Sequence, residues 1–170
     1  MLCLKIYIIG SVASGKTTLG YRLSNLLGIE MFEMDKIVHN DILKTKRKEE
    51  EQIRIINSIF NKKDWIIEGT HRKNMDFVFK EAEKIVLLDI SLSLRKRRIL
   101  LRWIKQKFGI EKVGYEPNID MLKNMYKWTK EFEESKSYLL KKLEKYNEKL
   151  IVFTNKDLKT IELNNIFKIS

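Results

Sequence analysis

The stretch that decides the fold is Leu4-Lys-Ile-Tyr-Ile-Ile-Gly10-Ser-Val-Ala-Ser-Gly15-Lys16-Thr17-Thr18. Residues 4–9 are an apolar run that predicts a strand buried on both faces, and residues 17–27 repeat leucine at helical spacing. Between them, residues 10–17 match the pattern G-x-x-x-x-G-K-[ST], which marks a phosphate-binding loop when a strand precedes it and a helix follows it. The sequence therefore predicts a site for a nucleoside triphosphate.

Such a loop presents backbone N–H groups and a helix N-terminus to phosphate oxygens. We expect Lys16 to reach the outer phosphates and the Thr17 hydroxyl to hold Mg²⁺. Residues 155–157 read Asn-Lys-Asp, one residue short of the guanine-reading Asn-Lys-x-Asp motif, so ATP is the predicted nucleotide. The predicted ATP-binding residues are Gly10, Ser11, Val12, Ala13, Ser14, Gly15, Lys16, Thr17 and Thr18.

Strand and helix patterns alternate along the whole chain, which is typical of a parallel sheet covered by helices on both faces. Further strands are predicted at 30–34, 65–68, 85–90 and 150–154. Helices are predicted at 93–107 and 119–147, and a helical region from about Asp35 includes 47–60. We therefore predict a single three-layer α/β/α domain, 1–170, with five strands.

Two segments have special roles in this prediction. Residues 108–118 contain two glycines and the only proline, Pro117, and suggest a lid or flap over about 103–120. The C-terminal segment, with Leu158, Ile161 and Ile166, predicts a short helical tail that packs over the last strand.

Composition limits the class of protein. Hydrophobic residues make up 44% and charged residues 34% of the 170, which is a globular balance. Cys3, the only cysteine, is expected to be buried in the first strand, which excludes intrachain disulfides and a Cys-based metal site. The N-terminal stretch, residues 1–10, is apolar for too few residues to span a bilayer and runs into the glycine-rich loop without a small-residue cleavage site, so we expect a cytoplasmic protein with no membrane partner. The net charge of +11 favours a polyanionic partner, although lysines alternating with glutamates over 123–149 are typical of a solvated helix face.

Acidic residues stand where predicted strands end, the edge at which ligands bind in open α/β sheets. Asp35 follows the second strand, Glu68 ends the third and Asp89 lies in the fourth. Arg98 and Arg102 follow on the next helix, one turn apart and therefore on one face.

Two stretches resemble known kinases. Residues 65–72, Trp-Ile-Ile-Glu-Gly-Thr-His-Arg, resemble the strand-end segment of adenylate kinases, with Glu68 in the place of the acid and Arg72 in that of the arginine. Asp89 followed by Arg98 and Arg102 matches a second feature of those kinases. Nearly the whole chain is similar to DNA topology modulation proteins, a branch of the same group. This resemblance implies a nucleoside-monophosphate-kinase fold with parallel strands in the order 2-3-1-4-5.

Phosphoryl transfer requires positioning and charge neutralisation, and the resemblance suggests which residues supply them. Glu68 is expected to act with Thr17 at Mg²⁺, Asp35 to orient the acceptor hydroxyl, and Arg72 to clamp an anionic group of the acceptor. The alternatives are a solvated strand end for Glu68, a helix N-cap for Asp35 and a plain basic helix face for the arginines. The predicted catalytic residues are Lys16, Asp35, Glu68, Arg98 and Arg102.

The predicted activity is that of an ATP-dependent small-molecule kinase, acting as a monomer or homodimer on a nucleoside, a nucleotide or another hydroxyl compound. Glu68 replaces the usual Asp and Phe-Pro is missing after Gly69, which argues against an orthodox adenylate kinase. One alternative is a regulatory NTPase that binds nucleic acid through residues 95–102 and the lysine-rich helices. Another is an ATP-binding scaffold without turnover.

Overall fold

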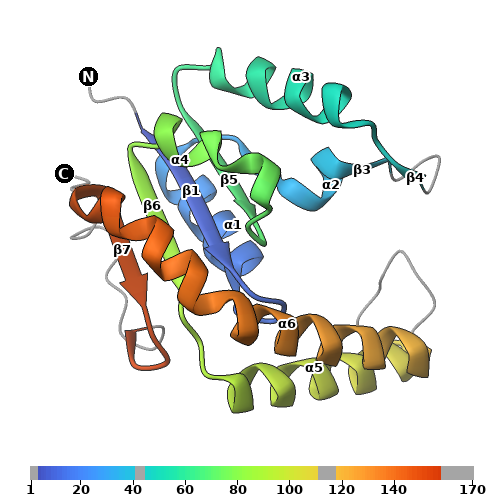
Figure 1. Cartoon of the computed structure of the whole chain (residues 1–170). Helices are drawn as coiled ribbons and strands as arrows, with labels where there is room; N and C mark the ends of the chain where they lie inside the picture. The colour runs from blue at the N-terminus through green and yellow to red at the C-terminus, as the bar shows by residue number, and fades with distance from the viewer. Residues whose placement is uncertain (1–3, 41–44, 111–117, 158–170) are drawn as a thin grey trace.

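A parallel five-stranded sheet forms the centre of the computed structural model, which describes residues 4–40, 45–110 and 118–157. Its strands stand in the order β2-β5-β1-β6-β7, and every pairing is parallel (Figure 1). Counted along the chain, this order is 2-3-1-4-5, so the predicted α/β fold and strand order are confirmed. The bounds are β1 (Lys5–Gly10), β2 (Met31–Glu33), β5 (Trp65–Gly69), β6 (Lys84–Leu88) and β7 (Leu150–Phe153).

The strand register brings several carboxyl ends to one edge of the sheet. Ile9 of β1 lies opposite Gly69 of β5 and Leu87 of β6, and Glu33 at the end of β2 lies opposite Glu68. This edge therefore holds the loop after β1, the predicted acidic residues and the loops that lead to the next helices. Ligands of open α/β sheets bind at this edge.

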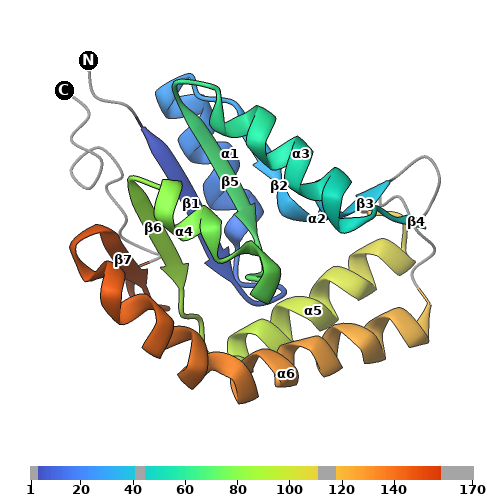
Figure 2. The same ribbon diagram turned by 45° about the horizontal axis from the view of Figure 1, so that its top comes forward.

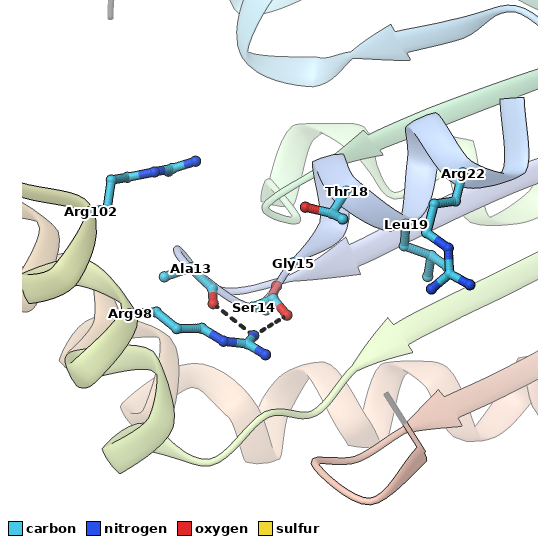
Figure 3. Close-up of a pocket in the computed structure, with 8 residues that line it drawn as sticks. All are labelled: Ala13, Ser14, Gly15, Thr18, Leu19, Arg22, Arg98 and Arg102. Atoms are coloured by element: carbon cyan, nitrogen blue, oxygen red, sulfur yellow. Dashed lines mark hydrogen bonds between the residues drawn. The ribbon is translucent and has the colours of Figure 1, made fainter. Parts of the chain in front are cut away.

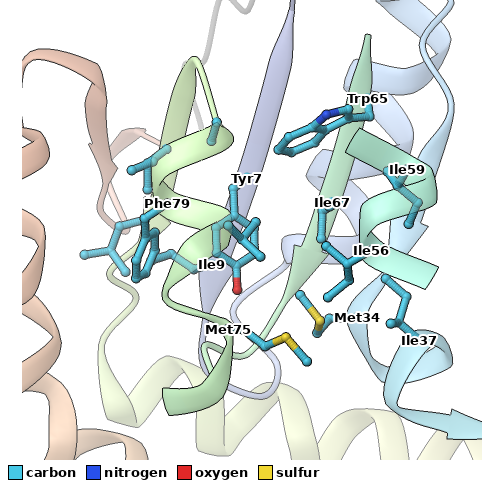
Figure 4. Close-up of a cluster of buried hydrophobic side chains, with 14 of the residues drawn as sticks. Tyr7, Ile9, Met34, Ile37, Ile56, Ile59, Trp65, Ile67, Met75 and Phe79 are labelled. Carbon is cyan, nitrogen blue, oxygen red and sulfur yellow. The ribbon is translucent and has the colours of Figure 1, made fainter. Parts of the chain in front are cut away.

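Helices cover both faces of the sheet because its strands are apolar on both sides. Helix α1 (Lys16–Leu27) packs Leu19 and Leu23 on one face. The other face carries α3 (Glu49–Phe60), α4 (Phe77–Glu81) and α6 (Ile119–Leu143), which surround buried Tyr7, Trp65 and Phe79 (Figure 4). Helix α5 (Leu92–Lys107) lies alongside α6 (Figure 2).

The region after Asp35 differs from the long helical stretch predicted there. Helix α2 (Met34–Val38) is followed by β3 (His39–Asn40), which pairs antiparallel with β4 (Thr45–Lys46). Arg47, predicted to be helical, instead donates hydrogen bonds to backbone carbonyls at the end of α2, those of Lys36, Ile37 and His39. These bonds satisfy carbonyl groups that a helix end leaves open, and α3 begins at Glu49.

Other boundaries differ less. The predicted helix 119–147 is α-helical to Leu143 and continues as the 3-10 helix η2 (Glu144–Lys149), while η1 (Lys73–Met75) and α4 had no predicted counterpart. Cys3, the tail at 158–170 and most of the predicted flap, 111–117, lie outside the described residues. Among the helices of the described ranges, none combines the length and the apolar character that crossing a membrane requires.

Candidate active site

The loop between β1 and α1 has the backbone that its two motif glycines allow. Gly15 has φ 102°, in the left-handed region that favours glycine. At Gly10 an added Cβ would lie 2.8 Å from Ser14 Oγ and 3.0 Å from the Leu88 carbonyl oxygen, so a larger residue would push the loop away from β6. Both glycines are therefore needed for this conformation.

Polar groups of the loop face inward. Lys16 Nζ donates to the Ser11 carbonyl oxygen over 2.8 Å. The hydroxyl oxygens of Ser11 and Ser14 are buried and have no hydrogen-bond partner among the described residues. Buried polar groups without partners are rare in proteins. Two such hydroxyls in one loop are expected where the loop receives an external polar ligand.

Glu68 of β5 lies beside the first turn of α1 and is only 5% exposed. Its Oε1 accepts a hydrogen bond from Thr17 Oγ1 over 3.0 Å. Burial raises the pKa of Glu68, against the opposing effects of the Lys16 charge and the Thr17 hydrogen bond. Burial lowers the pKa of Lys16, against the attraction of Glu68 and Asp35. The interpretation of Glu68 as a solvated strand end is therefore wrong.

Magnesium would fit this corner only together with a nucleotide. Thr17 and Glu68 supply hard oxygen donors, the type that Mg²⁺ prefers, and proteins commonly complete its shell with phosphate oxygens and water. Across residues 4–40, 45–110 and 118–157, no group of three or more His, Cys, Asp or Glu side chains could hold a metal ion.

The two predicted arginines of α5 line the pocket beside the loop, and Arg98 contacts the loop backbone (Figure 3). Arg98 Nη1 donates to the carbonyl oxygens of Ala13, at 3.2 Å, and Ser14, at 2.9 Å. Arg102 lines the same pocket of about 380 Å³, as does Arg22 of α1. Arg22 was not predicted, although it stands four residues after Thr18 and so shares its helix face. Arg98 is engaged by the loop rather than by solvent alone.

Helix α5 is fastened to the sheet and to α6. Arg95, 1% exposed, donates from Nε to the Ile90 carbonyl oxygen over 2.8 Å and from Nη2 to Glu133 of α6. Asp89 pairs with Lys136 of α6 at 2.5 Å, and the N-cap of α5 is Ser91. Asp89 is therefore an ion-pair partner and not the helix cap.

Asp35 in α2 and Arg72 in the loop after β5 form an ion pair. Asp35 Oδ1 accepts a hydrogen bond from Arg72 Nη2 over 2.8 Å. The N-cap of α2 is Glu33, so the interpretation of Asp35 as an N-cap is wrong. An added Cβ at Gly69 would collide with Met34, which shows how closely α2 approaches the end of β5.

Contacts of His71 and Asp76 hold the loop that carries Arg72 against α4 and α6. His71 Nε2 lies 2.9 Å from Asp76 Oδ1, and its ring stacks on Phe79 with a centroid separation of 4.6 Å. Asp76 also pairs with Lys142 of α6. Burial lowers the pKa of His71, against the opposing effect of Asp76. His71 is therefore packed into the base of the loop.

Comparison with known proteins shows the fold. No model of a known protein family and no curated protein matches the sequence. Shikimate kinase from Bacteroides thetaiotaomicron aligns with a TM-score of 0.58 and 18% identity, over 98% of this chain and 99% of that chain. Shikimate kinase from Acinetobacter baumannii, in complex with shikimate, gives 0.59 and 18%, over 97% and 94%.

Deoxyadenosine kinase from M. mycoides with bound dATP gives a TM-score of 0.53 and 16% identity, over 98% of each chain. These likenesses cover nearly the whole length of every chain compared. The present chain has the α/β fold of P-loop kinases.

Proposed function

We propose that this protein is an ATP-dependent kinase that transfers the γ-phosphoryl group to a hydroxyl group of a small acceptor. The observation that carries the proposal is the placement of two polar pairs at one edge of the sheet. Glu68 near the end of β5 accepts from Thr17, and Asp35, just after the neighbouring strand β2, pairs with Arg72, so one pair would serve the donor and the other the acceptor.

The donor side is the phosphate-binding loop with its arginines. Backbone N–H groups of residues 10–18 hold the phosphates, and Lys16 moves from the Ser11 carbonyl oxygen to the outer phosphates. Arg98 and Arg102 add positive charge from the pocket on the opposite side of the loop. Thr17 and Glu68 would hold Mg²⁺ together with the nucleotide, and the ion would supply positive charge against the charge that builds up during transfer.

The acceptor side is the Asp35–Arg72 pair. Asp35 accepts the proton of the acceptor hydroxyl while the oxygen of that hydroxyl bonds to the γ-phosphorus. The bond between this phosphorus and the ADP oxygen breaks at the same time. Arg72 binds an anionic group of the acceptor through its guanidinium, giving up part of its contact with Asp35. Residues 103–120 serve as a lid that excludes water during transfer.

Kinase activity is tested by following ADP release from ATP and Mg²⁺ in the presence of nucleosides, nucleoside monophosphates and small hydroxy acids. Lys16→Ala should be inactive. Lys62→Ala, which removes a surface lysine paired with Glu30, is the matched control and should remain active. Turnover that requires an acceptor and is lost only in the first variant supports the proposal. Binding of ATP without turnover on any acceptor contradicts it.

The net charge of +11 favours a second candidate, an ATP-dependent regulator that binds nucleic acid, as the resemblance to DNA topology modulation proteins suggests. Arg95 and Arg98 are committed to Glu133 and to the loop, so two cations of the 95–102 segment are unavailable to a polyanion. Binding of duplex DNA that weakens steeply with rising salt supports this candidate.

A further inference from the structure

The outward side of α5 carries a row of large apolar residues. Leu100, Ile104 and Phe108 follow each other every four residues, and Leu101 lies beside them, so the four side chains form one stripe. Their exposed fractions are 42%, 37%, 77% and 47%, in the order just given. This set is called the outer stripe below.

The outer stripe does not belong to the core, and none of its residues lines the pocket beside the phosphate-binding loop, although Ile104 and Phe108 lie in the segment proposed as a lid. The opposite side of α5 buries Arg95 and Ile99 against α6, and Arg98 turns toward the phosphate-binding loop. Figure 1 shows α5 along the lower edge of the molecule, with α6 and the sheet above it. An external partner can therefore reach the stripe without covering the loop.

Cations flank the outer stripe on both sides. Lys96 and Lys107 follow one flank, Lys105 the other, and Arg97 lies within the stripe; all four are exposed. Across the described ranges, none of these four side chains takes part in an ion pair. The sequence has no acidic residue from Ile90 to Ile110, so nothing on the helix itself offsets this charge.

This combination identifies the chemistry of the partner. A second copy of the chain would place the same cations face to face, which disfavours a symmetric contact. Nucleic acid would pair with the cations and leave the leucines in water. A bilayer with anionic headgroups accommodates both the apolar stripe and the cations, because apolar side chains enter the acyl boundary while the lysines pair with the headgroups.

We propose that the outer stripe of α5 docks the protein on the surface of an anionic lipid bilayer. Leu100, Leu101, Ile104 and Phe108 enter the acyl boundary, and the flanking lysines and Arg97 lie at headgroup level. This proposal departs from the sequence-based expectation of no membrane partner, which rested on the lack of a segment able to span a bilayer. The proposal is independent of kinase activity.

Sedimentation with lipid vesicles tests the docking on the full chain. Vesicles of phosphatidylcholine with about one-third phosphatidylserine should bind the protein, and pure phosphatidylcholine vesicles should bind it at least about tenfold more weakly. Leu100→Ser with Leu101→Ser should lower binding to the anionic vesicles about tenfold or more. The matched control is Leu26→Ser with Leu140→Ser, which removes leucines 42% and 37% exposed elsewhere.

A charge variant separates the two contributions. Lys96→Gln with Arg97→Gln should weaken binding about tenfold, whereas Lys127→Gln with Lys130→Gln on α6 should change it little. Circular dichroism and ATP binding check that each variant is folded. Absence of binding to anionic vesicles, or equal binding by the stripe variant and its control, overturns the proposal. The proposal is also overturned if the stripe variant loses self-association but still binds the anionic vesicles.

Discussion

Thr17 Oγ1 donates a hydrogen bond to Glu68 Oε1 over 3.0 Å, although 51 positions separate the two residues in the chain. The contact exists because β1 and β5 are parallel neighbours, with Ile8 opposite Glu68. It places a carboxylate beside the first turn of α1 in a nearly water-free position. A buried carboxylate is costly unless it is paired, and here the Lys16 charge and the Thr17 hydroxyl stabilise it beside the phosphate-binding loop, which directs attention to function.

Glu68→Gln keeps the shape of the side chain and an oxygen for the Thr17 hydrogen bond but removes the charge. We expect turnover to fall by about a hundredfold or more, with a higher Mg²⁺ concentration for half-maximal rate, because a carboxylate oxygen is lost at the metal. Rates measured across a magnesium series check this. Glu83→Gln, at an exposed position before β6, is the control. Unchanged magnesium dependence in Glu68→Gln would remove this residue from the site.

Arg98→Ala should weaken ATP binding by about tenfold to a hundredfold, because it removes a cation held at the loop. The neighbouring Arg97 is exposed, and Arg97→Ala should leave ATP affinity within about twofold of the original protein. Calorimetric titration with ATP and Mg²⁺ measures both. Equal losses in the two variants would point to general electrostatic attraction rather than to a specific contact.

The phosphate-binding loop and the five strands could be predicted because each depends on a local pattern, whereas the strand order was implied only by the resemblance to a known family. Apolar runs and the glycine-lysine motif are visible without knowledge of tertiary contacts. The position of Glu68 near a strand end was predicted on the same basis, whereas the match of Asp35 to a strand-ending acid came from the resemblance, and Asp35 lies in α2 just after β2. Arg98 was singled out by its spacing from Asp89, which places it on α5 two turns after the strand ends.

Other features depend on contacts between distant segments. Strands β3 and β4 have two residues each, too few to show a period, and Arg47 ends α2 through bonds that follow from the hairpin. The Asp35–Arg72 pair depends on the close approach of Met34 to Gly69, for which the sequence carries no local signal. The lysine and arginine contacts of α6 also join segments far apart in the chain.

Glu133→Gln should lower the free energy of unfolding by roughly 2–3 kcal/mol, because Arg95 is buried and would lose its only anionic partner on α6. The estimate is at the low end for such pairs since Glu133 is 33% exposed. Glu131, which pairs with Lys127 at 3.8 Å on the helix surface, is the control. Glu131→Gln should cost less than about 0.5 kcal/mol in the same urea titration. Similar costs for both would mean that Arg95 does not depend on this carboxylate.

His71 should make the fold sensitive to mild acid. Its folded-state pKa is lowered, chiefly by burial, so the unfolded chain binds a proton at a higher pH than the folded one. Stability from this group is therefore complete above the ordinary histidine pKa of about 6.5 and is lost as pH falls through that value toward the folded-state pKa. His71→Gln should lose less stability than the original protein between about pH 8 and about pH 5.5. Urea unfolding at both pH values measures the difference, and His39→Gln, at an exposed histidine, should retain the original acid sensitivity. Equal losses of stability on acidification in His71→Gln and His39→Gln would mean that protonation of another group causes the acid sensitivity. The contact of His71 with Asp76 would then only hold the His71 side chain in place.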